Sequence, residues 1–386
     1  MGFQSELHFG ALSVQFMEGF LVWMAACSVR SKWDLDHGWK GFEDVDVVPS
    51  YSVSSGEGVL RMKPILLQAH ERSLTKILYN KDGDLLFTAS KHNLPNVWWS
   101  INGERLGTYN GHNGAIWDMA VSSDSTQLLT ASADQSCIIW DSETGKILHQ
   151  MAAKSPVRSC GFSLTNNILC FTTDKAMNQP CFIKFYDLRD KEQVATNSPF
   201  RDIQIEDSKV NRMIWGTVED YVITGHENGQ ICQYDWKTGE RLRVDHSHDA
   251  LIKDLQLSKD RTMLITASKD TTAKLFDAKT FQFLKSYKTD RPVNSAAVSP
   301  IKHHILLGGG QEAMEVTTSH TKSGKFEARF FHLIFEEEIG RVKGHFGPIN
   351  TLAFHPNGKQ YSSGAEDGYV RIHDFDQSYY DFEYDF

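Results

Sequence analysis

Four histidines in this chain each stand 28 residues ahead of a position that holds an aromatic residue or a further histidine. A fixed spacing that recurs along a chain indicates that one structural unit has been copied several times. That repetition constrains the fold before the chemistry of any residue is considered. The pairs are His70 with Trp98, His112 with Trp140, His248 with Phe276 and His345 with His373, and six residues before each second member stand His92, Asp134, Asp270 and Asp367.

The unit resembles the WD40 repeat, and its second copy shows this most clearly. That copy runs from Gly111-His112 through residues 130–134, whose sequence is TASAD, to Trp140-Asp141. Positions equivalent to Trp140 follow one another at steps of 42, 46, 48 and 42 residues, and a gap of 97 residues then leaves room for one divergent copy. A period of roughly 40–45 residues is that of a four-stranded propeller blade. The sequence therefore predicts an all-β fold, a seven-bladed WD40 β-propeller.

In the WD40 unit a loop histidine, a hairpin aspartate, a strand serine and the tryptophan N–H form one hydrogen-bond network. Tryptophan can only donate and an ionised aspartate can only accept, so the set is complementary and its members cooperate. Serine, histidine and aspartate also make up a hydrolase triad, but here they recur once per blade and no G-x-S-x-G motif surrounds a serine. We therefore expect a structural network formed by His112, Ser132, Asp134, Trp140, His248, Ser268, Asp270, His345 and Asp367.

Individual copies depart from the repeat. The first has His92 in place of the aspartate, which predicts an incomplete network, and the fourth has Asn228 there. The third lacks the leading histidine, and its hairpin at 174–180 is lengthened. The sixth, at about 293–342, contains a glycine-rich insertion. Insertions in propellers project from the rim, where partners often bind, although a loop without such a role is the alternative.

The two ends of the repeated region complement each other. Ile65-Leu66-Leu67 stands where the outer strand of a blade belongs, and the segment 349–374 supplies only three strands. We expect both ends to build one blade, so that no sheet edge stays open around the ring. This places the propeller at residues 62–376 and leaves an acidic, aromatic C-terminal tail at 377–386.

Residues 1–61 form an N-terminal extension outside the propeller. The stretch from Phe9 to Cys27 is apolar, but Gln15 and Glu18 interrupt it and no basic segment precedes its most apolar part. These features argue against a signal peptide and against a membrane span. We expect the extension to be peripheral or an artefact of gene prediction, and a weak membrane anchor is the alternative.

Composition narrows the classes of function. With 49 acidic and 40 basic residues the net charge is −9, which does not favour broad nucleic-acid binding. The six cysteines include no C-x-x-C pair, and Gly324-Lys325 is followed by Phe326 where a phosphate loop needs Ser or Thr. We therefore expect a cytosolic protein with reduced thiols, and no catalytic residue, metal ion or cofactor.

Longer stretches of the chain resemble subunit I of eukaryotic translation initiation factor 3. The start Met62-Lys63-Pro64-Ile65-Leu66 is similar to the family's own N-terminus. Sequence that is specific to the family stands in three further places: residues 102–109 between the first two copies, the run 308–332 and the segment from Phe335 to Pro348. The resemblance covers Met62 to about Phe386, and residues 1–61 match nothing in the family.

This resemblance implies a non-enzymatic scaffold subunit in the cytoplasm. In the family the propeller docks initiation factor 3 subunits B and G, and the factor helps the 40S ribosomal subunit to recruit mRNA and to scan it. No direct sequence-specific nucleic-acid binding and no membrane contact are expected. The resemblance assigns Asp260, Leu275 and Asp277 to a contact with a basic amphipathic helix. The alternative is that Leu275 belongs to the core and Asp277 is only the aspartate of the repeat.

Two other functions remain open at the level of sequence. Relatives of the family have been described as partners of a TGF-β-type receptor kinase, so a WD40 signalling adaptor is the first alternative. An enzyme that uses the central channel is the second, and a channel lined with clustered acid–base residues of shifted pKa would favour it.

Overall fold

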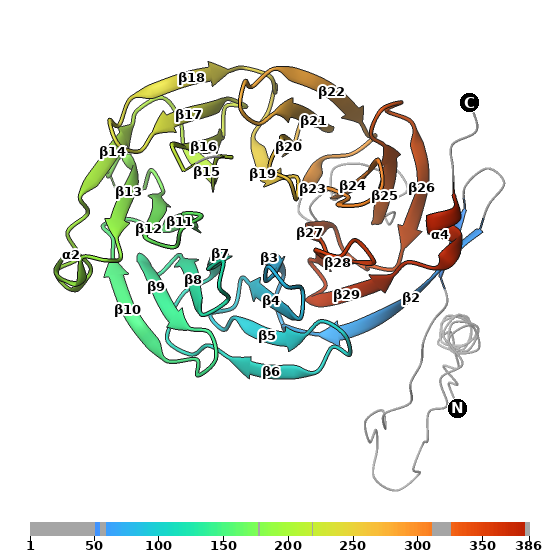
Figure 1. The fold of residues 1–386 in the computed structure, drawn as a ribbon, viewed down its shortest axis with the longest axis horizontal. Coiled ribbons are helices and arrows are strands. Elements are labelled where there is room, and N and C mark those ends of the chain that lie inside the picture. The colour runs from blue at the N-terminus through green and yellow to red at the C-terminus, as the bar shows by residue number, and fades with distance from the viewer. Residues whose placement is uncertain (1–50, 55–58, 177, 218, 311–325, 383–386) are drawn as a thin grey trace, which may run out of the picture. The chain divides into compact units, whose positions relative to one another are not determined.

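The computed structural model describes residues 51–54, 59–176, 178–217, 219–310 and 326–382, with side chains from residue 64 onward. In this part of the chain seven antiparallel sheets are arranged in a ring (Figure 1). One edge strand of each sheet lies nearest the centre of the ring, and the other strands follow outwards. The predicted seven-bladed β-propeller is thereby confirmed. The insertion predicted in the sixth copy falls largely on residues 311–325, which lie outside the described residues.

We number the blades in chain order from the one that contains Trp98. Blade one consists of β3 (Leu74–Tyr79), β4 (Leu85–Ser90), β5 (Asn96–Trp99) and β6 (Arg105–Thr108). Blade two consists of β7 (Ile116–Val121), β8 (Gln127–Ser132), β9 (Ser136–Asp141) and β10 (Ile147–Ala152). Blade three consists of β11 (Val157–Phe162), β12 (Ile168–Thr173), β13 (Cys181–Asp187) and β14 (Arg201–Ile205). Blades four and five consist of β15 (Val210–Trp215), β16 (Tyr221–His226), β17 (Ile231–Asp235) and β18 (Arg241–Asp245), and of β19 (Ile252–Leu257), β20 (Met263–Ser268), β21 (Thr272–Asp277) and β22 (Phe283–Lys288). Blade six consists of β23 (Val293–Val298), β24 (His304–Gly309), β25 (Glu327–His332) and β26 (Glu338–Lys343). A short helix, α2 (Lys191–Ala195), connects β13 to β14.

Tight turns join the second and third strands of each regular blade, and their backbone explains two glycines. Gln135 and Thr271 adopt positive φ values of 68° and 71° at this turn, and Gly229 and Gly368 stand at the same place in blades four and seven. A Cβ on either glycine would lie only 2.1–2.2 Å from a backbone carbonyl oxygen of the next blade's histidine loop. Glycine is therefore required where the turn of one blade packs against the loop of the next.

The hydrophobic core of the described residues is divided into seven clusters, one between each pair of neighbouring blades. Middle strands are buried on both faces because blades cover them from both sides, as in β8. Apolar burial stabilises by roughly 25 cal/mol per Å² removed from water, so the stabilisation lies mainly between sheets and not within one.

Blade seven closes the ring as predicted. It contains β27 (Ile349–Phe354), β28 (Gln360–Ala365) and β29 (Tyr369–Asp374), and β2 (Val59–Gln68) pairs antiparallel with β29 as its outer strand. A further strand, β1 (Tyr51–Ser54), pairs with β2. The sheet thus begins before residue 62, where we expected the propeller to start.

Part of the predicted tail belongs to the packed body of the propeller. The helix α4 (Gln377–Asp381) buries Tyr379, whose ring lies 3.9 Å from that of Phe375. The Tyr379 hydroxyl hydrogen-bonds His304 Nδ1 at 2.9 Å, and Lys302 Nζ donates to the Tyr380 carbonyl at 2.6 Å. These contacts fix the start of the tail against blade six.

Candidate functional site

The histidine networks are present and join the loop before a blade to the turn between its second and third strands. In blade two His112 Nδ1 lies 2.8 Å from Asp134 Oδ2, and its Nε2 lies 2.7 Å from Thr130 Oγ1. Trp140 Nε1 donates to the same hydroxyl at 2.8 Å. The arrangement recurs with His248, Thr266 and Asp270 in blade five and with His345, Ser363 and Asp367 in blade seven.

The strand hydroxyl of the network stands two residues earlier than we expected. Ser132 Oγ accepts from the backbone N–H of Asp134 at 3.2 Å, and Ser268 Oγ donates to the Leu251 carbonyl at 3.1 Å. The prediction that these two serines contact the histidines is therefore wrong. Side chains two apart share one face of a strand, so only the reach of the histidine loop decides which of them meets the ring. A constant spacing of 18 residues from each histidine to a Thr or Ser would have identified the right hydroxyl.

Other blades carry reduced versions of the network. In blade one His70 Nε2 lies 2.9 Å from Thr88 Oγ1 and no described carboxylate completes the set, which confirms the incomplete network predicted there. Blade four takes its histidine from β16: His226 Nε2 lies 2.8 Å from Thr224 Oγ1. Apolar residues, Phe171 and Leu307, hold the hydroxyl's place in blades three and six.

Burial and charge indicate a structural role for these sets. His112, Thr130 and Trp140 are each at most 1% exposed, so the hydroxyl cannot reach a substrate. Burial raises the pKa of Asp134, but hydrogen bonds from His112 and Ser136 outweigh it, and the pKa lies well below its usual value. The carboxylate therefore stays ionised and holds the loop to the turn.

The central channel is lined by one residue that every blade contributes in the same way. The first strand of each blade has a β-bulge at its second residue, where the register shifts. A bulge leaves the extra residue unpaired and re-aims its side chain, here towards the channel. We call these residues the bulge ring: Thr75, Trp117, Arg158, Asn211, Lys253, Asn294 and Asn350.

Members of the bulge ring tie neighbouring blades together. Thr75 Oγ1 donates to the Ile116 carbonyl at 2.7 Å, and Asn211 Nδ2 donates to the Ile252 carbonyl at 3.2 Å. Asn294 donates to the Ile349 carbonyl at 3.0 Å. Each bond runs from one blade to the first strand of the next, so the ring is held by polar contacts at its narrowest point.

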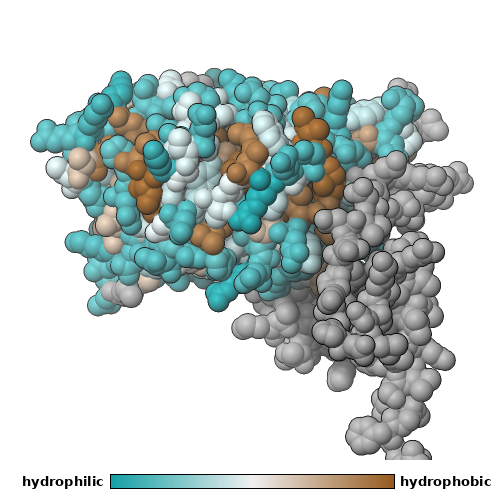
Figure 2. All heavy atoms as spheres, turned by 90° about the horizontal axis from the view of Figure 1, so that it is seen from below, coloured by the Kyte–Doolittle hydropathy of each residue, from teal (hydrophilic) through white to brown (hydrophobic). Residues whose placement is uncertain are grey.

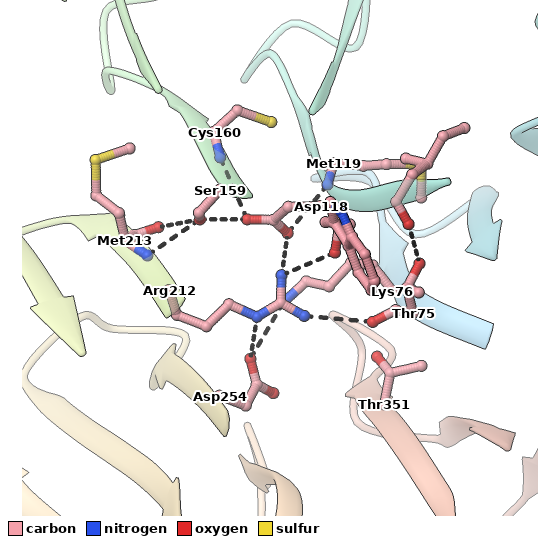
Figure 3. A network of polar contacts seen from close by, with 12 residues as sticks. Thr75, Lys76, Asp118, Met119, Ser159, Cys160, Arg212, Met213, Asp254 and Thr351 are labelled. Carbon is pink, nitrogen blue, oxygen red and sulfur yellow. Dashed lines mark hydrogen bonds and ion pairs between the residues drawn. The ribbon is translucent and has the colours of Figure 1, made fainter. Parts of the chain in front are cut away.

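One residue further along the same strands, buried charges form an ion network (Figure 3). Arg212 Nη1 lies 2.6 Å from Asp118 Oδ1, and its Nε lies 3.6 Å from Asp254 Oδ1. Lys76 Nζ pairs with Asp254 at 3.4 Å. Ser295 donates to Asp254 at 2.6 Å, while Ser159 donates to Asp118. Side chains from blades one, two, three, four, five and six thus meet across the channel.

The charged groups of the ion network pair with one another, and their pKa shifts do not activate a group for catalysis. Burial raises the pKa of Asp254, but Lys76 and Arg212 outweigh it, so the pKa is lowered. Burial likewise lowers the pKa of Arg212, and Asp118 and Asp254 more than reverse that effect. Both shifts favour the ordinary ionised forms. A general acid or base needs the opposite, a pKa moved towards neutrality.

The structure places the three predicted contact residues in different environments. Asp260 is exposed in the turn between β19 and β20, and Asp277 ends β21. The two turns adjoin because Ala278 N donates to the Thr262 carbonyl at 2.8 Å. Leu275 is only 1% exposed, within the cluster between blades five and six. Its predicted partner contact is therefore wrong, because alternation along β21 turns it into the core.

Asp277 also has a local task. Its Oδ1 accepts from the backbone N–H of Lys279 at 3.0 Å and of Thr280 at 2.7 Å. These bonds stabilise the turn into β22 and lower the pKa of the carboxyl. Of the three predicted residues, only Asp260 combines exposure with a charge that could meet a partner.

The described part of the chain contains neither a cluster of metal ligands nor a helix that could span a membrane. It contains no group of three or more His, Cys, Asp or Glu placed to hold a metal ion. Its five cysteines are buried free thiols. None of its helices has the length and apolar character needed to cross a bilayer.

Comparison with known proteins identifies the family. The family model described as EIF3I matches residues 62–385. Eukaryotic translation initiation factor 3 subunit I of Homo sapiens is 58% identical over 324 residues, which cover 84% of this chain and all of that protein. The Taeniopygia guttata protein gives the same values, and that of Danio rerio is 58% identical over 322 residues, 83% of this chain and 99% of its own. A seven-bladed propeller that matches these proteins over their full length belongs to the family of eukaryotic translation initiation factor 3 subunit I.

Proposed function

We propose that the chain acts in translation initiation as a non-enzymatic scaffold subunit of initiation factor 3. It docks initiation factor 3 subunits B and G and thereby supports recruitment of the 40S ribosomal subunit to mRNA, and scanning, in the cytoplasm. The observation that carries this proposal is the 58% identity to subunit I over its whole length. Buried charges that pair with one another along the channel support a role in binding more than one in catalysis.

The contact with the B component of the factor is proposed for the face of blade five that carries Asp260. Successive turns of an antiparallel sheet lie alternately at the two ends of its strands, and in a propeller these ends form the two faces of the ring. Asp260 therefore lies on the face opposite the histidine loops. With Leu275 buried, exposed residues of the outer strands supply the apolar part of the contact. Phe283 and Leu284 of β22 are 50% and 40% exposed, and Leu242 of the neighbouring β18 is 49% exposed. Carboxylates beside such residues suit a basic amphipathic helix.

A scaffold for two partners needs a second surface. Leu106 on β6 and Ile147 and Leu148 on β10 are between 42% and 45% exposed. Figure 2, which views the rim from the side of these strands, shows hydrophobic residues gathered between hydrophilic ones. Exposed apolar groups of this kind mark sites of protein association, and we assign the G component of the factor to this side of the rim.

The test is purification of the tagged chain from cytosol, with the B and G components and 40S ribosomal subunits expected to co-purify. Asp260→Lys introduces repulsion against a basic helix, and we expect it to lower recovery of the B component at least about tenfold. Asp277 is left intact because its carboxylate accepts from two backbone N–H groups of its turn, whereas that of Asp260 accepts from one.

Asp124→Lys provides a matched control. Asp124 occupies the equivalent turn of blade two and makes the same local bonds, with Ser122 and Thr126 in place of Ser258 and Thr262. Both substitutions therefore disturb the fold equally, which a thermal melt can verify. Equal recovery of the B component with the two variants would remove blade five from the contact. A wild-type preparation with a receptor kinase and without initiation factors would instead favour the signalling adaptor.

A further inference from the structure

A cavity of about 220 Å³ opens at the channel mouth, on the face that carries the histidine loops. The bulge ring forms its wall, and Lys91 and Glu227 stand at its edge in turns between second and third strands. Arg212 of the ion network also lines it. The volume is enough for one or two side chains and too small for a helix or strand pair, because a water molecule alone occupies roughly 30 Å³.

The charges facing this cavity are predominantly positive. Among the described residues Lys91, Arg158, Lys253 and Arg212 line it, with Glu227 as the acidic member, and Lys253 already has a partner of its own. The charge of Arg212 is already matched by Asp118 and Asp254 below. A positive excess in a confined mouth stands out on a chain whose net charge is −9. Narrow clefts lined by one sign of charge concentrate ligands of the opposite sign.

Arg158 is positioned to bind an anion. Its guanidinium carbon lies over the Trp117 ring, 4.5 Å from the ring centroid, and this cation–π contact restrains the group. Asp174 and Glu227 lie near Arg158, but no carboxylate of the described residues forms an ion pair with it, and Asp174 pairs with Lys209. Guanidinium donors in a fixed plane match a carboxylate in two parallel hydrogen bonds.

The asparagines of the bulge ring favour a polypeptide ligand. Asn211 and Asn294 use their Nδ2 groups on backbone carbonyls, so their amide oxygens are held in place as acceptors. A ligand that complements the mouth therefore needs both an anion and N–H donors. An acidic peptide supplies the first from its side chains and the second from its backbone.

From this geometry we propose that the channel mouth is a binding site for an acidic peptide segment, with Arg158 contacting one carboxylate and Lys91 a neighbouring one. The site lies on the face opposite Asp260 and is independent of the contact proposed for blade five. A partner that uses it would place an acidic loop or terminus over the centre of the ring.

Fluorescence anisotropy on the full chain tests this with labelled hexaglutamate as the probe. Hexaglutamate should bind saturably, about tenfold or more tightly than hexaglutamine, and the affinity should fall with salt. Labelled hexauridylate, an RNA of similar charge, should bind more weakly. Equal affinity for hexaglutamine, absence of saturable binding, or tighter binding of the RNA would each overturn the proposal.

Variants then locate the site. Lys91→Gln and Arg158→Gln should each weaken hexaglutamate binding by about fivefold or more. Lys81→Gln is the matched control, because Lys81 is an exposed lysine of the same blade on the opposite face. Lys91 is itself exposed, so its variant should melt like the wild type even if Arg158→Gln does not. Binding that is insensitive to Lys91→Gln and Arg158→Gln, or equally reduced by Lys81→Gln, would refute the site. Asp260→Lys should leave this affinity unchanged, which separates the result from that of the co-purification test.

Discussion

At the scale of single residues, one buried hydroxyl organises each complete histidine network. Thr130 Oγ1 lies within hydrogen-bond distance of both His112 Nε2 and Trp140 Nε1. The indole can only donate, so the hydroxyl must accept from it, and its own hydrogen is free to turn to the histidine. Removal of the hydroxyl would leave two buried partners unsatisfied at once.

We predict that Thr130→Val destabilises the protein by about 1–3 kcal/mol, because valine keeps the shape and loses the bonds. Ser132→Ala should cost less, under about 1 kcal/mol, since it removes only a hydrogen bond of 3.2 Å to a backbone N–H. Urea unfolding of both variants is the measurement. An equal or greater loss for Ser132→Ala would contradict the network as described.

Buried neutral histidines should also make stability depend on pH. Burial lowers the pKa of His226 and of His304 to about 4 from 6.5. The unfolded chain binds protons at these sites between the two values and the native chain does not. The stability that these two histidines contribute is therefore fully present above about pH 6.5 and is lost as the pH falls towards 4.

At about 1.4 kcal/mol per pKa unit, each site should contribute about 2 kcal/mol to the loss of unfolding free energy between about pH 7 and pH 5. His226→Asn should reduce that loss by about this amount, whatever it does to stability at neutral pH. His149→Asn, at an exposed histidine, should leave it unchanged. Equal pH dependence of all three proteins would show that His226 is not buried in its neutral form.

At the scale of elements, the ring depends on one strand that comes from the other end of the chain. Residues Lys63–Gln68 of β2 pair one by one with β29. Without them β29 would present an open edge, which is a template for association with other chains. The same strand also contributes Leu67 to the cluster between blades seven and one.

Two deletions distinguish the extension from the closing strand. Removal of residues 1–61 should leave a folded monomer that assembles with its partners, because the six pairs to β29 remain. Removal of residues 1–68 should lower the melting temperature and cause aggregation, as size-exclusion chromatography would reveal. Aggregation of the shorter deletion, or its move from membrane to cytosol, would give residues 1–61 a role that we do not expect.

At the scale of the whole molecule, the ion network ties six blades together across the channel. Arg212 compensates both buried carboxylates, Asp118 and Asp254. Removing one partner from a buried ion pair costs about 3–5 kcal/mol, because an uncompensated charge remains inside the protein.

Arg212→Ala should therefore destabilise the propeller by about 3–5 kcal/mol. Arg189→Ala should destabilise the protein far less, because Arg189 is 66% exposed in its pair with Asp187 and water screens that pair. Denaturant unfolding of the two variants gives the comparison. A similar cost for both would mean that the network adds little to closure of the ring.

The sequence by itself determined the number of blades, the closing of the ring by both ends and the incomplete network of blade one. These features follow from spacing and strand alternation, which depend on neighbours along the chain and recur with each copy. The histidine and aspartate of each complete network were also predictable, since their roles repeat, whereas His226 of blade four was not.

Only the tertiary structure decided which hydroxyl meets the histidine, that Leu275 faces a neighbouring blade, and that Lys76, Asp118, Arg212 and Asp254 meet in the channel. Lys76 and Asp254 are 178 residues apart. The repeat pattern of the copy in which each stands does not require a charged residue at that position. Their pairing arises because seven bulged strands converge on one axis. Such convergence depends on the closed ring and not on any segment, so no local pattern records it.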